Sequence, residues 1–153
     1  MKGFLACLLL LAAPLHAEER PVFYPFDVTL GGTKAEMKEG NELFAEVSKP
    51  VASDAVLLLK KEVPVLIVNL FACTEDGSFN VSLPSAIIIA KQVKEVKLDA
   101  TMDKKKLRPG TYFASIEADG MDLCMVFTIG APDGKPKVDF STILEFLKKA
   151  GGE

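Results

Sequence analysis

Short apolar runs separated by turn residues follow one another along most of the chain. Within several of these runs apolar and polar residues alternate with a period of two, which is the pattern of a strand with one buried face. The runs that predict strands lie at 26–30, 43–47, 55–60, 63–73, 86–90, 96–100, 111–118 and 121–129. Strands of this length and spacing predict an all-β domain, a β-sandwich of about seven to nine strands.

The strongest local signal is Asp119-Gly120, which separates two alternating runs. A two-residue type I′ turn needs positive φ at both central positions, and Asp-Gly meets that need. This turn fixes a register in which these pairs lie on one face: Ala118 with Met121, Ile116 with Leu123, Ala114 with Met125, and Tyr112 with Phe127. Every member of these pairs is apolar or Tyr, so we assign this face to the core. A slip of one residue would bury Glu117 and Asp122 instead.

A single helix is predicted near the C-terminus, at 140–149. Asp139 or Ser141 is the expected N-cap, and Gly151 follows as a stop signal. The apolar residues of this segment form one stripe, made of Phe140, Ile143, Leu144 and Leu147. Lys148 and Lys149 lie in the last turn, where the helix dipole favours cations.

The segment from Leu107 to Tyr112 reads Leu-Arg-Pro-Gly-Thr-Tyr. Its Leu107, Pro109, Gly110 and Tyr112 resemble the tyrosine corner of immunoglobulin-like Greek-key sandwiches. In that corner the Tyr hydroxyl bonds backwards to the chain that crosses over the core. With the final hairpin the resemblance covers 107–129, and it is similar to the small secreted immunoglobulin-like domains of bacteria. The resemblance implies an immunoglobulin-like β-sandwich with roles in adhesion, in surface appendages such as pili, or in carbohydrate or protein binding. The chain departs from antibody domains because it has no Trp and no Cys two residues after Tyr112.

Residues 1–17 have the features of a cleavable secretory signal peptide. Lys2 precedes an apolar run at 4–13 that is too short to span a bilayer, and Ala17 ends a cleavage-site-like sequence. We therefore expect an exported protein, periplasmic or extracellular, at the cell surface. The expected organisation is a signal peptide at 1–17, a sandwich at 18–130, and a linker with an amphipathic helix at 131–153.

Cleavage would remove His16, the only histidine in the chain. The remaining domain would have no imidazole for Ser-His or Cys-His catalysis or for a His-ligated metal. It would carry 17 basic residues (18 less Lys2) against 21 acidic ones, a net charge of −4. This balance gives no indication of nucleic-acid binding. No later apolar run is long enough for a transmembrane segment. We predict no cofactor, no metal and no catalytic residue.

Cys73 and Cys124 would both enter an oxidising compartment, where two cysteines in a small domain are expected to form a disulfide. Cys124 lies on the hairpin face opposite the predicted core. Cys73 shares a face with Val65, Ile67, Asn69 and Phe71, and Asn69 marks that face as the outer one. The predicted disulfide therefore lies on the outside of the sheet. A redox pair and a Cu(I) site with Met121 and Met125 are weaker alternatives, because neither the spacing nor the register suits them.

The same outer face carries a large apolar area that water would not tolerate uncovered. We therefore predict a partner face made of Phe71, Phe113, Val126, Phe140, Ile143, Leu144 and Leu147. Two arrangements stay open. In the first, the helix covers its own sheet; in the second, the helix or the bared sheet docks on another protein or on a second copy.

These patterns favour a non-catalytic exported binding or structural domain at the cell envelope, associated with adhesion or a pilus. Two other functions stay open: a periplasmic carrier of a small ligand or soft metal, and a histidine-free enzyme that uses carboxylates or the thiols of Cys73 and Cys124. A lysine run at 104–106 is expected to be a solvated loop, with electrostatic attraction to an acidic glycan or membrane surface as its alternative.

Overall fold

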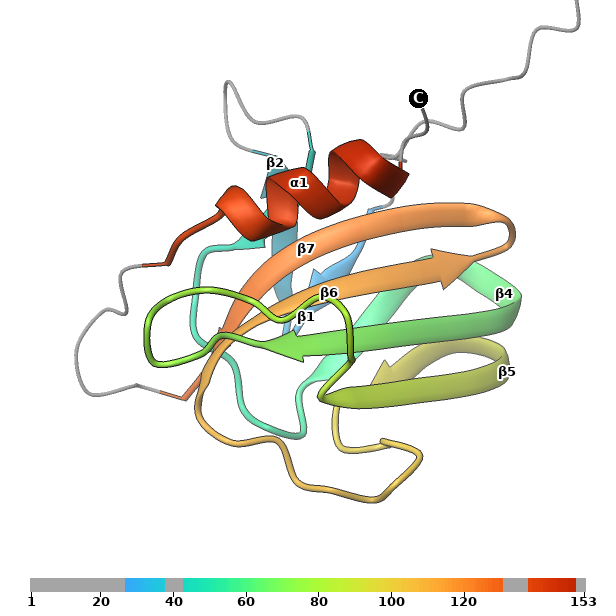
Figure 1. The fold of residues 1–153 in the computed structure, drawn as a ribbon. Coiled ribbons are helices and arrows are strands. Elements are labelled where there is room, and N and C mark those ends of the chain that lie inside the picture. Colours follow the sequence, from blue (N-terminus) through green and yellow to red (C-terminus); the bar gives the residue numbers. More distant parts are fainter. Residues whose placement is uncertain (1–26, 38–42, 131–137, 151–153) are drawn as a thin grey trace, which may run out of the picture.

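The computed structural model describes residues 27–37, 43–130 and 138–150. These residues form seven strands and one helix (Figure 1). The elements in chain order are β1 (Thr29–Leu30), β2 (Thr33–Met37), β3 (Ala45–Val47), β4 (Val56–Ala72), β5 (Ala86–Lys97), β6 (Gly110–Ala118), β7 (Met121–Ile129) and α1 (Ser141–Ala150). The expectation of a mostly β protein with a short C-terminal helix is therefore correct. The predicted signal peptide at 1–17 and the linker at 131–137 lie outside the described residues.

The strands close into a six-stranded barrel and do not form two separate sheets. Their order is β1-β2-β3-β7-β6-β4, and β1 pairs again with β4 to complete the ring. β4 makes this closure because its first part pairs with β1 at Leu57 and Leu58, while its second part, Leu66 to Ala72, pairs with β6. The predicted sandwich is therefore corrected to a closed barrel, in which the long strand β4 pairs with β1 near one end and with β6 near the other.

β4 and β5 are each longer than the sequence predicts. The two runs predicted at 55–60 and 63–73 both lie in β4. The run at 86–90 and the start of the next run, at 96–97, both lie in β5. The alternation breaks because β4 carries a register shift between Leu58 and Val63, and because Gln92 of β5 has a positive φ of 51°. Such irregularities change which side chains face inward without ending the strand.

The final hairpin has the predicted register. Asp119 and Gly120 both have positive φ, and Ala118 pairs with Met121 and Tyr112 with Phe127. The residues assigned to the core face line the barrel interior, except that Met121 at the turn is partly exposed. The hydroxyl of Tyr112 donates a hydrogen bond to the carbonyl of Arg108 over 2.9 Å.

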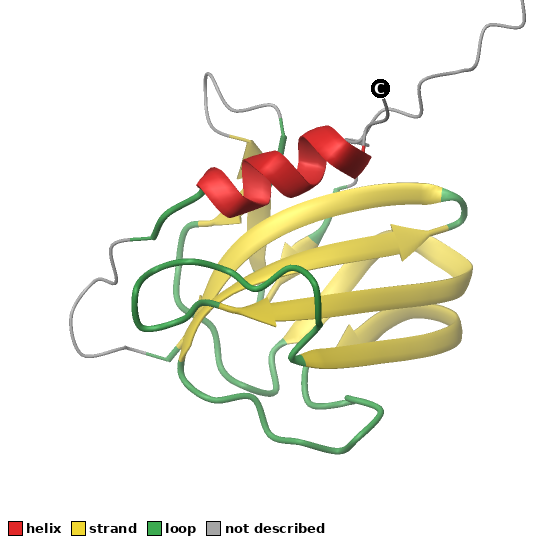
Figure 2. Cartoon of the chain, viewed as in Figure 1, coloured by secondary structure: helices red, strands yellow, loops and turns green. Residues whose placement is uncertain are grey.

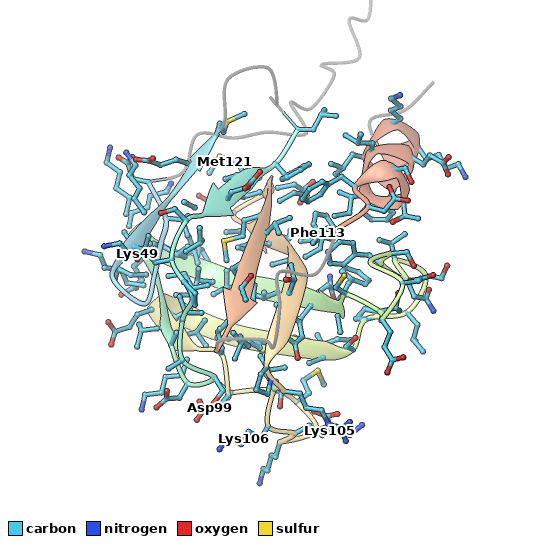
Figure 3. All side chains as sticks on the ribbon, turned by 90° about the vertical axis from the view of Figure 1, so that its left-hand side faces the viewer. Lys49, Asp99, Lys105, Lys106, Phe113 and Met121 are labelled. Carbon is cyan, nitrogen blue, oxygen red and sulfur yellow. The ribbon has the colours of Figure 1, made fainter. Side chains whose placement is uncertain are left out.

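A second core lies outside the barrel, between the sheet and α1 (Figure 2). Asp139 accepts a hydrogen bond from the Ser141 amide, so this carboxylate satisfies one of the free amides at the start of α1. The buried members of this outer core are Phe44, Phe71, Phe79, Phe113, Cys124, Val126, Ile143 and Leu147. Phe113 is fully buried on the side of the sheet that faces α1 (Figure 3).

Of the two arrangements left open by the sequence, the structure has the helix on its own sheet. Ile143 and Leu147 are buried against Phe71, Phe113 and Val126, and Phe140 and Leu144 pack at the border of the same cluster. The seven residues of the predicted partner face therefore belong to one apolar cluster within the chain. No helix in the described part of the chain is long and apolar enough to cross a membrane.

Candidate functional site

The two cysteines are free thiols, so the predicted disulfide is wrong for this fold. The backbone amide of Cys73 donates a hydrogen bond to the carbonyl of Thr111 in β6, whereas Cys124 of β7 lies opposite Ser115 of β6. They are thus two strands apart and four residues out of register, or about 16 Å between Cα atoms at ordinary sheet spacings. A disulfide requires Cα atoms within about 7 Å. Both cysteine side chains face outward from the barrel, as expected, but a disulfide between them would require the strands to change their pairing.

The environment of each thiol opposes ionisation. Burial of Cys124 under α1, with a smaller effect of the Asp122 carboxylate, raises the pKa of its thiol to about 12. Partial burial, and then the Asp76 carboxylate, raises the pKa of Cys73 as well. Reactive cysteines have lowered pKa values. Cys124 is therefore a packing residue of the outer core.

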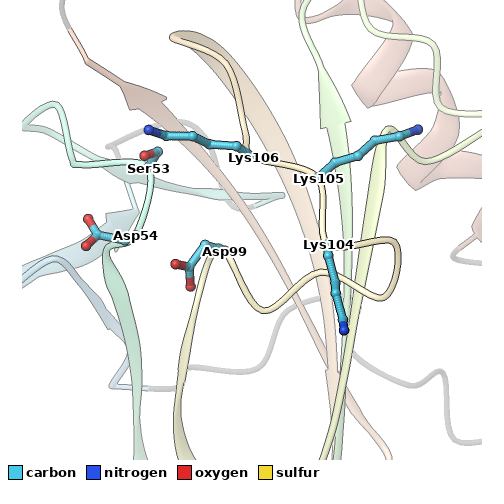
Figure 4. Close-up of a pocket in the computed structure, with 6 residues that line it drawn as sticks. All are labelled: Ser53, Asp54, Asp99, Lys104, Lys105 and Lys106. Carbon is cyan, nitrogen blue, oxygen red and sulfur yellow. The ribbon is translucent and has the colours of Figure 1, made fainter.

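Two surface grooves of about 470 Å³ each carry polar groups. The first is lined by Ser53, Asp54, Asp99, Lys104, Lys105 and Lys106. Figure 4 shows that its lysine side chains diverge: Lys106 extends toward Ser53, while Lys105 points away from it. Lys105 is also paired with Asp103 at 3.2 Å. This arrangement agrees with a solvated loop, because a site for an anion needs cations that converge.

The second groove lies between α1 and the loop at 79–82. Phe79, Val81 and Phe146 form its apolar part, and Glu145 and Lys149 of α1 contribute opposite charges. Thr142 is already engaged by the backbone amide of Phe79. No three His, Cys, Asp or Glu side chains among the described residues are grouped closely enough to hold a metal ion.

The most distinctive surface is the outer edge of β5, together with the face beside it. β5 stands at the end of the strand order and pairs only with β4 among the described strands. Figure 1 shows β5 at the rim of the sheet, with no strand beyond it. We refer to this rim, from Ile87 to Lys91, as the β5 edge.

The register of β4 with β5 shows which backbone groups the β5 edge leaves open. In an antiparallel pair, the amides and carbonyls of alternate residues point to opposite sides of the strand. The Ile87 carbonyl accepts a hydrogen bond from the Met102 amide, which lies on the side of β5 away from β4. Ile87, Ile89 and Lys91 therefore direct their backbone groups away from β4.

An exposed apolar strip lies along this edge on the outer face. Val65 and Ile67 of β4 lie opposite Lys91 and Ile89 of β5 in the register. Val65 is 43% exposed and Ile89 is 48% exposed, although both are β-branched residues with a preference for burial. The sequence signal for this surface was the run Ile87 to Ile89, which the sequence analysis predicted to be part of a strand without assigning its exposed face.

The chain matches no protein-family profile, no curated protein and no solved structure.

Proposed function

We propose that this chain is an exported, non-catalytic binding or structural domain that acts at the cell envelope through protein contact. The observation that carries the proposal is the open β5 edge, which lies beside the exposed apolar side chains of Val65 and Ile89. Adhesion and assembly into a surface appendage are the envelope roles that we include in it.

An unpaired strand edge is a ready site for another strand. Its free amides and carbonyls give main-chain hydrogen bonds, and the side chains on one face give selectivity. Small domains usually shield such an edge because it promotes aggregation. At the β5 edge the described residues supply one shielding bond, from Met102 to Ile87. Ile89 and Lys91 are left available for a partner.

The grooves give less support to a catalytic or carrier role. An active site or small-ligand pocket gathers a few polar groups around a concave surface. In the groove beside α1 the lining is partly apolar, and Thr142 is used by the fold itself. In the lysine groove the charged side chains diverge.

The proposal is tested by site-specific photo-crosslinking in the cells that produce the protein. A photo-reactive residue replaces Ile89 in the full chain, and the matched control replaces Lys49, which is exposed in the segment between β3 and β4 (Figure 3). We expect an exported chain that begins at Glu18 and a crosslink from position 89 to a defined strand-forming segment of one protein. A chain that keeps residues 1–17, or equal crosslinking from positions 49 and 89, would overturn the proposal.

A further inference from the structure

We infer that the β5 edge receives an extended peptide segment of a partner protein, with its apolar residues beside Ile87 and Ile89 and its acidic residues beside Lys91 and Lys94. This inference rests on the proposed function and names the chemistry of the partner. It follows from three properties of the strand: its open backbone groups, its apolar half and its basic half.

The backbone of the β5 edge offers a short ladder. Three residues offer backbone groups that have no partner among the described residues: Ile89 and Lys91 offer an amide and a carbonyl each, and Ile87 offers its amide, because its carbonyl accepts from Met102. Gln92 has a positive φ of 51° and breaks the regular strand immediately afterwards. The partner strand is therefore expected to order about five residues against 87–91, or about 16 Å of extended chain.

The apolar half of the strand selects the side chains of that segment. Ile87 and Ile89 lie on the outer face, next to Asn69 and Ile67 of β4 in the register. A partner strand paired with the β5 edge would place every second side chain on the same face. β-Branched side chains at these positions would cover Ile89 and remove apolar surface from water.

The basic half of β5 determines which charge the partner segment should carry. β5 continues through Lys91, Lys94 and Lys97, all exposed, with Glu95 as its single acidic residue. None of these lysines forms an ion pair with a residue in the described part of the chain, whereas Lys60 and Lys61 of β4 are paired with Asp27 and Asp119. The acidic residue nearest to these lysines in the register is Glu62 of β4, which precedes Val63 and so lies beside Lys94. Lys91 lies opposite Val65 and has no acidic residue opposite it on β4. Carboxylates on the partner are the complementary groups.

The same lysines oppose pairing with a second copy. Two β5 strands aligned antiparallel about Lys94 would place lysines opposite lysines, and alignment about Ile89 would place Lys91 opposite Ile87 of the other copy. Like charges directly opposite destabilise a strand pair. The alignment about Ile89 avoids like charges, but it leaves Lys91 opposite an apolar side chain and supplies no carboxylate. A segment of different sequence, with an apolar end and an acidic end, complements both halves of β5.

The test measures binding of labelled eight-residue peptides to the full chain by fluorescence anisotropy at low salt. Each probe has valines alternating with threonines at one end and two glutamates at the other. Both polarities are made, because an antiparallel strand needs the glutamates first and a parallel strand needs them last. Matched control peptides carry lysines in place of the glutamates.

We expect one glutamate peptide to bind about tenfold more tightly than its lysine counterpart. Lys91→Glu should remove or reverse this preference, whereas Lys49→Glu should leave it unchanged. Ile89→Pro should weaken both peptides, because proline removes an outward amide that β4 does not use. Circular dichroism establishes whether each variant is folded. If Ile89→Pro does not fold, the result for Lys91→Glu still decides the test.

Three results would overturn the inference. Equal affinity for glutamate and lysine peptides, with both lost in Ile89→Pro, would contradict the acidic partner and leave docking at the β5 edge intact. If neither peptide binds, the inference that the β5 edge receives an extended segment with an acidic end is wrong. The crosslink from position 89 would then decide the proposed function separately. Dimerisation of the chain in light scattering that Ile89→Pro abolishes would assign the edge to a second copy.

Discussion

Cys73 and Cys124 both face outward from the sheet, yet they lie on opposite sides of β6 and four residues out of register. Both are free thiols. The stability of the domain therefore depends on its two apolar cores, one inside the barrel and one between the sheet and α1.

Thiol titration should find two free thiols per chain in a form that lacks residues 1–17. Under non-reducing, denaturing conditions both should react with a disulfide reagent. In the native state Cys73 should react first, because Cys124 is buried and its thiol has a pKa of about 12. A denatured chain with no reactive thiol would contradict the register of β4, β6 and β7.

Truncation of Ile143 should destabilise the whole domain. Its side chain is 0% exposed in the outer core, so Ile143→Ala should lower the free energy of unfolding by about 2–5 kcal/mol. The matched control is Leu83→Ala, at a side chain that is 72% exposed, with an expected change within about 0.5 kcal/mol. Denaturant unfolding measures both, and equal effects would show that α1 is not part of the folded unit.

The variant Tyr112→Phe should cost about 1 kcal/mol of stability, because it removes the hydrogen bond to the Arg108 carbonyl and keeps the ring in the core. The stacked contact with Phe127, with ring centroids 5.7 Å apart, should be retained. Thermal unfolding of the variant and the parent chain checks this expectation. A variant as stable as the parent would show that this hydrogen bond does not stabilise the segment from Arg108 to Tyr112.

Acid should weaken the loop at 74–78 through Asp76. Hydrogen bonds from Thr74 and then Ser78 lower the pKa of the Asp76 carboxyl to about 2, below its value in an unfolded chain. The contribution of this carboxylate is therefore fully present above about pH 4 and is lost as the pH falls toward 2. Titration of the carboxyl by NMR measures the pKa directly. A normal pKa for Asp76, or an unchanged acid transition in Asp76→Asn, would contradict this account of the loop.

The local pattern of apolar and polar residues was enough to predict the elements whose contacts are close in sequence. The register of β6 with β7 followed from Asp119-Gly120 and the alternation around it, and the apolar stripe of α1 was visible in the spacing of Ile143 and Leu147. These elements are set by turn chemistry and by periodicity. Both are properties of a few neighbouring residues.

Long-range pairing was not visible in the same way. Closure of the barrel depends on β4 pairing with β1 at one end and with β6 at the other. The irregularities near Leu58 and Gln92 hid the continuity of β4 and β5, so the sequence suggested a sandwich of shorter strands. The disulfide prediction failed for the same reason: sharing an outward face places two cysteines on one side of the sheet but does not give their separation along it.

The β5 edge was missed because Ile87 to Ile89 has the composition of a buried strand. Only the position of β5 at the end of the strand order makes part of this run exposed. Apolar residues on an edge strand cannot be distinguished by composition from apolar residues in a core.

Amide hydrogen exchange across β5, residue by residue, shows whether the β5 edge is open and whether a peptide occupies it. In the free chain, we expect fast exchange at Ile89 and Lys91, and slow exchange at Ile88 and Ala90, whose amides point toward β4. On addition of the preferred glutamate peptide, Ile89 and Lys91 should become protected, while Ile88 and Ala90 stay as they were. Slow exchange at Ile89 in the free chain, or no added protection at Ile89 and Lys91 when the peptide is bound, would contradict the assignment of the β5 edge as a docking strand.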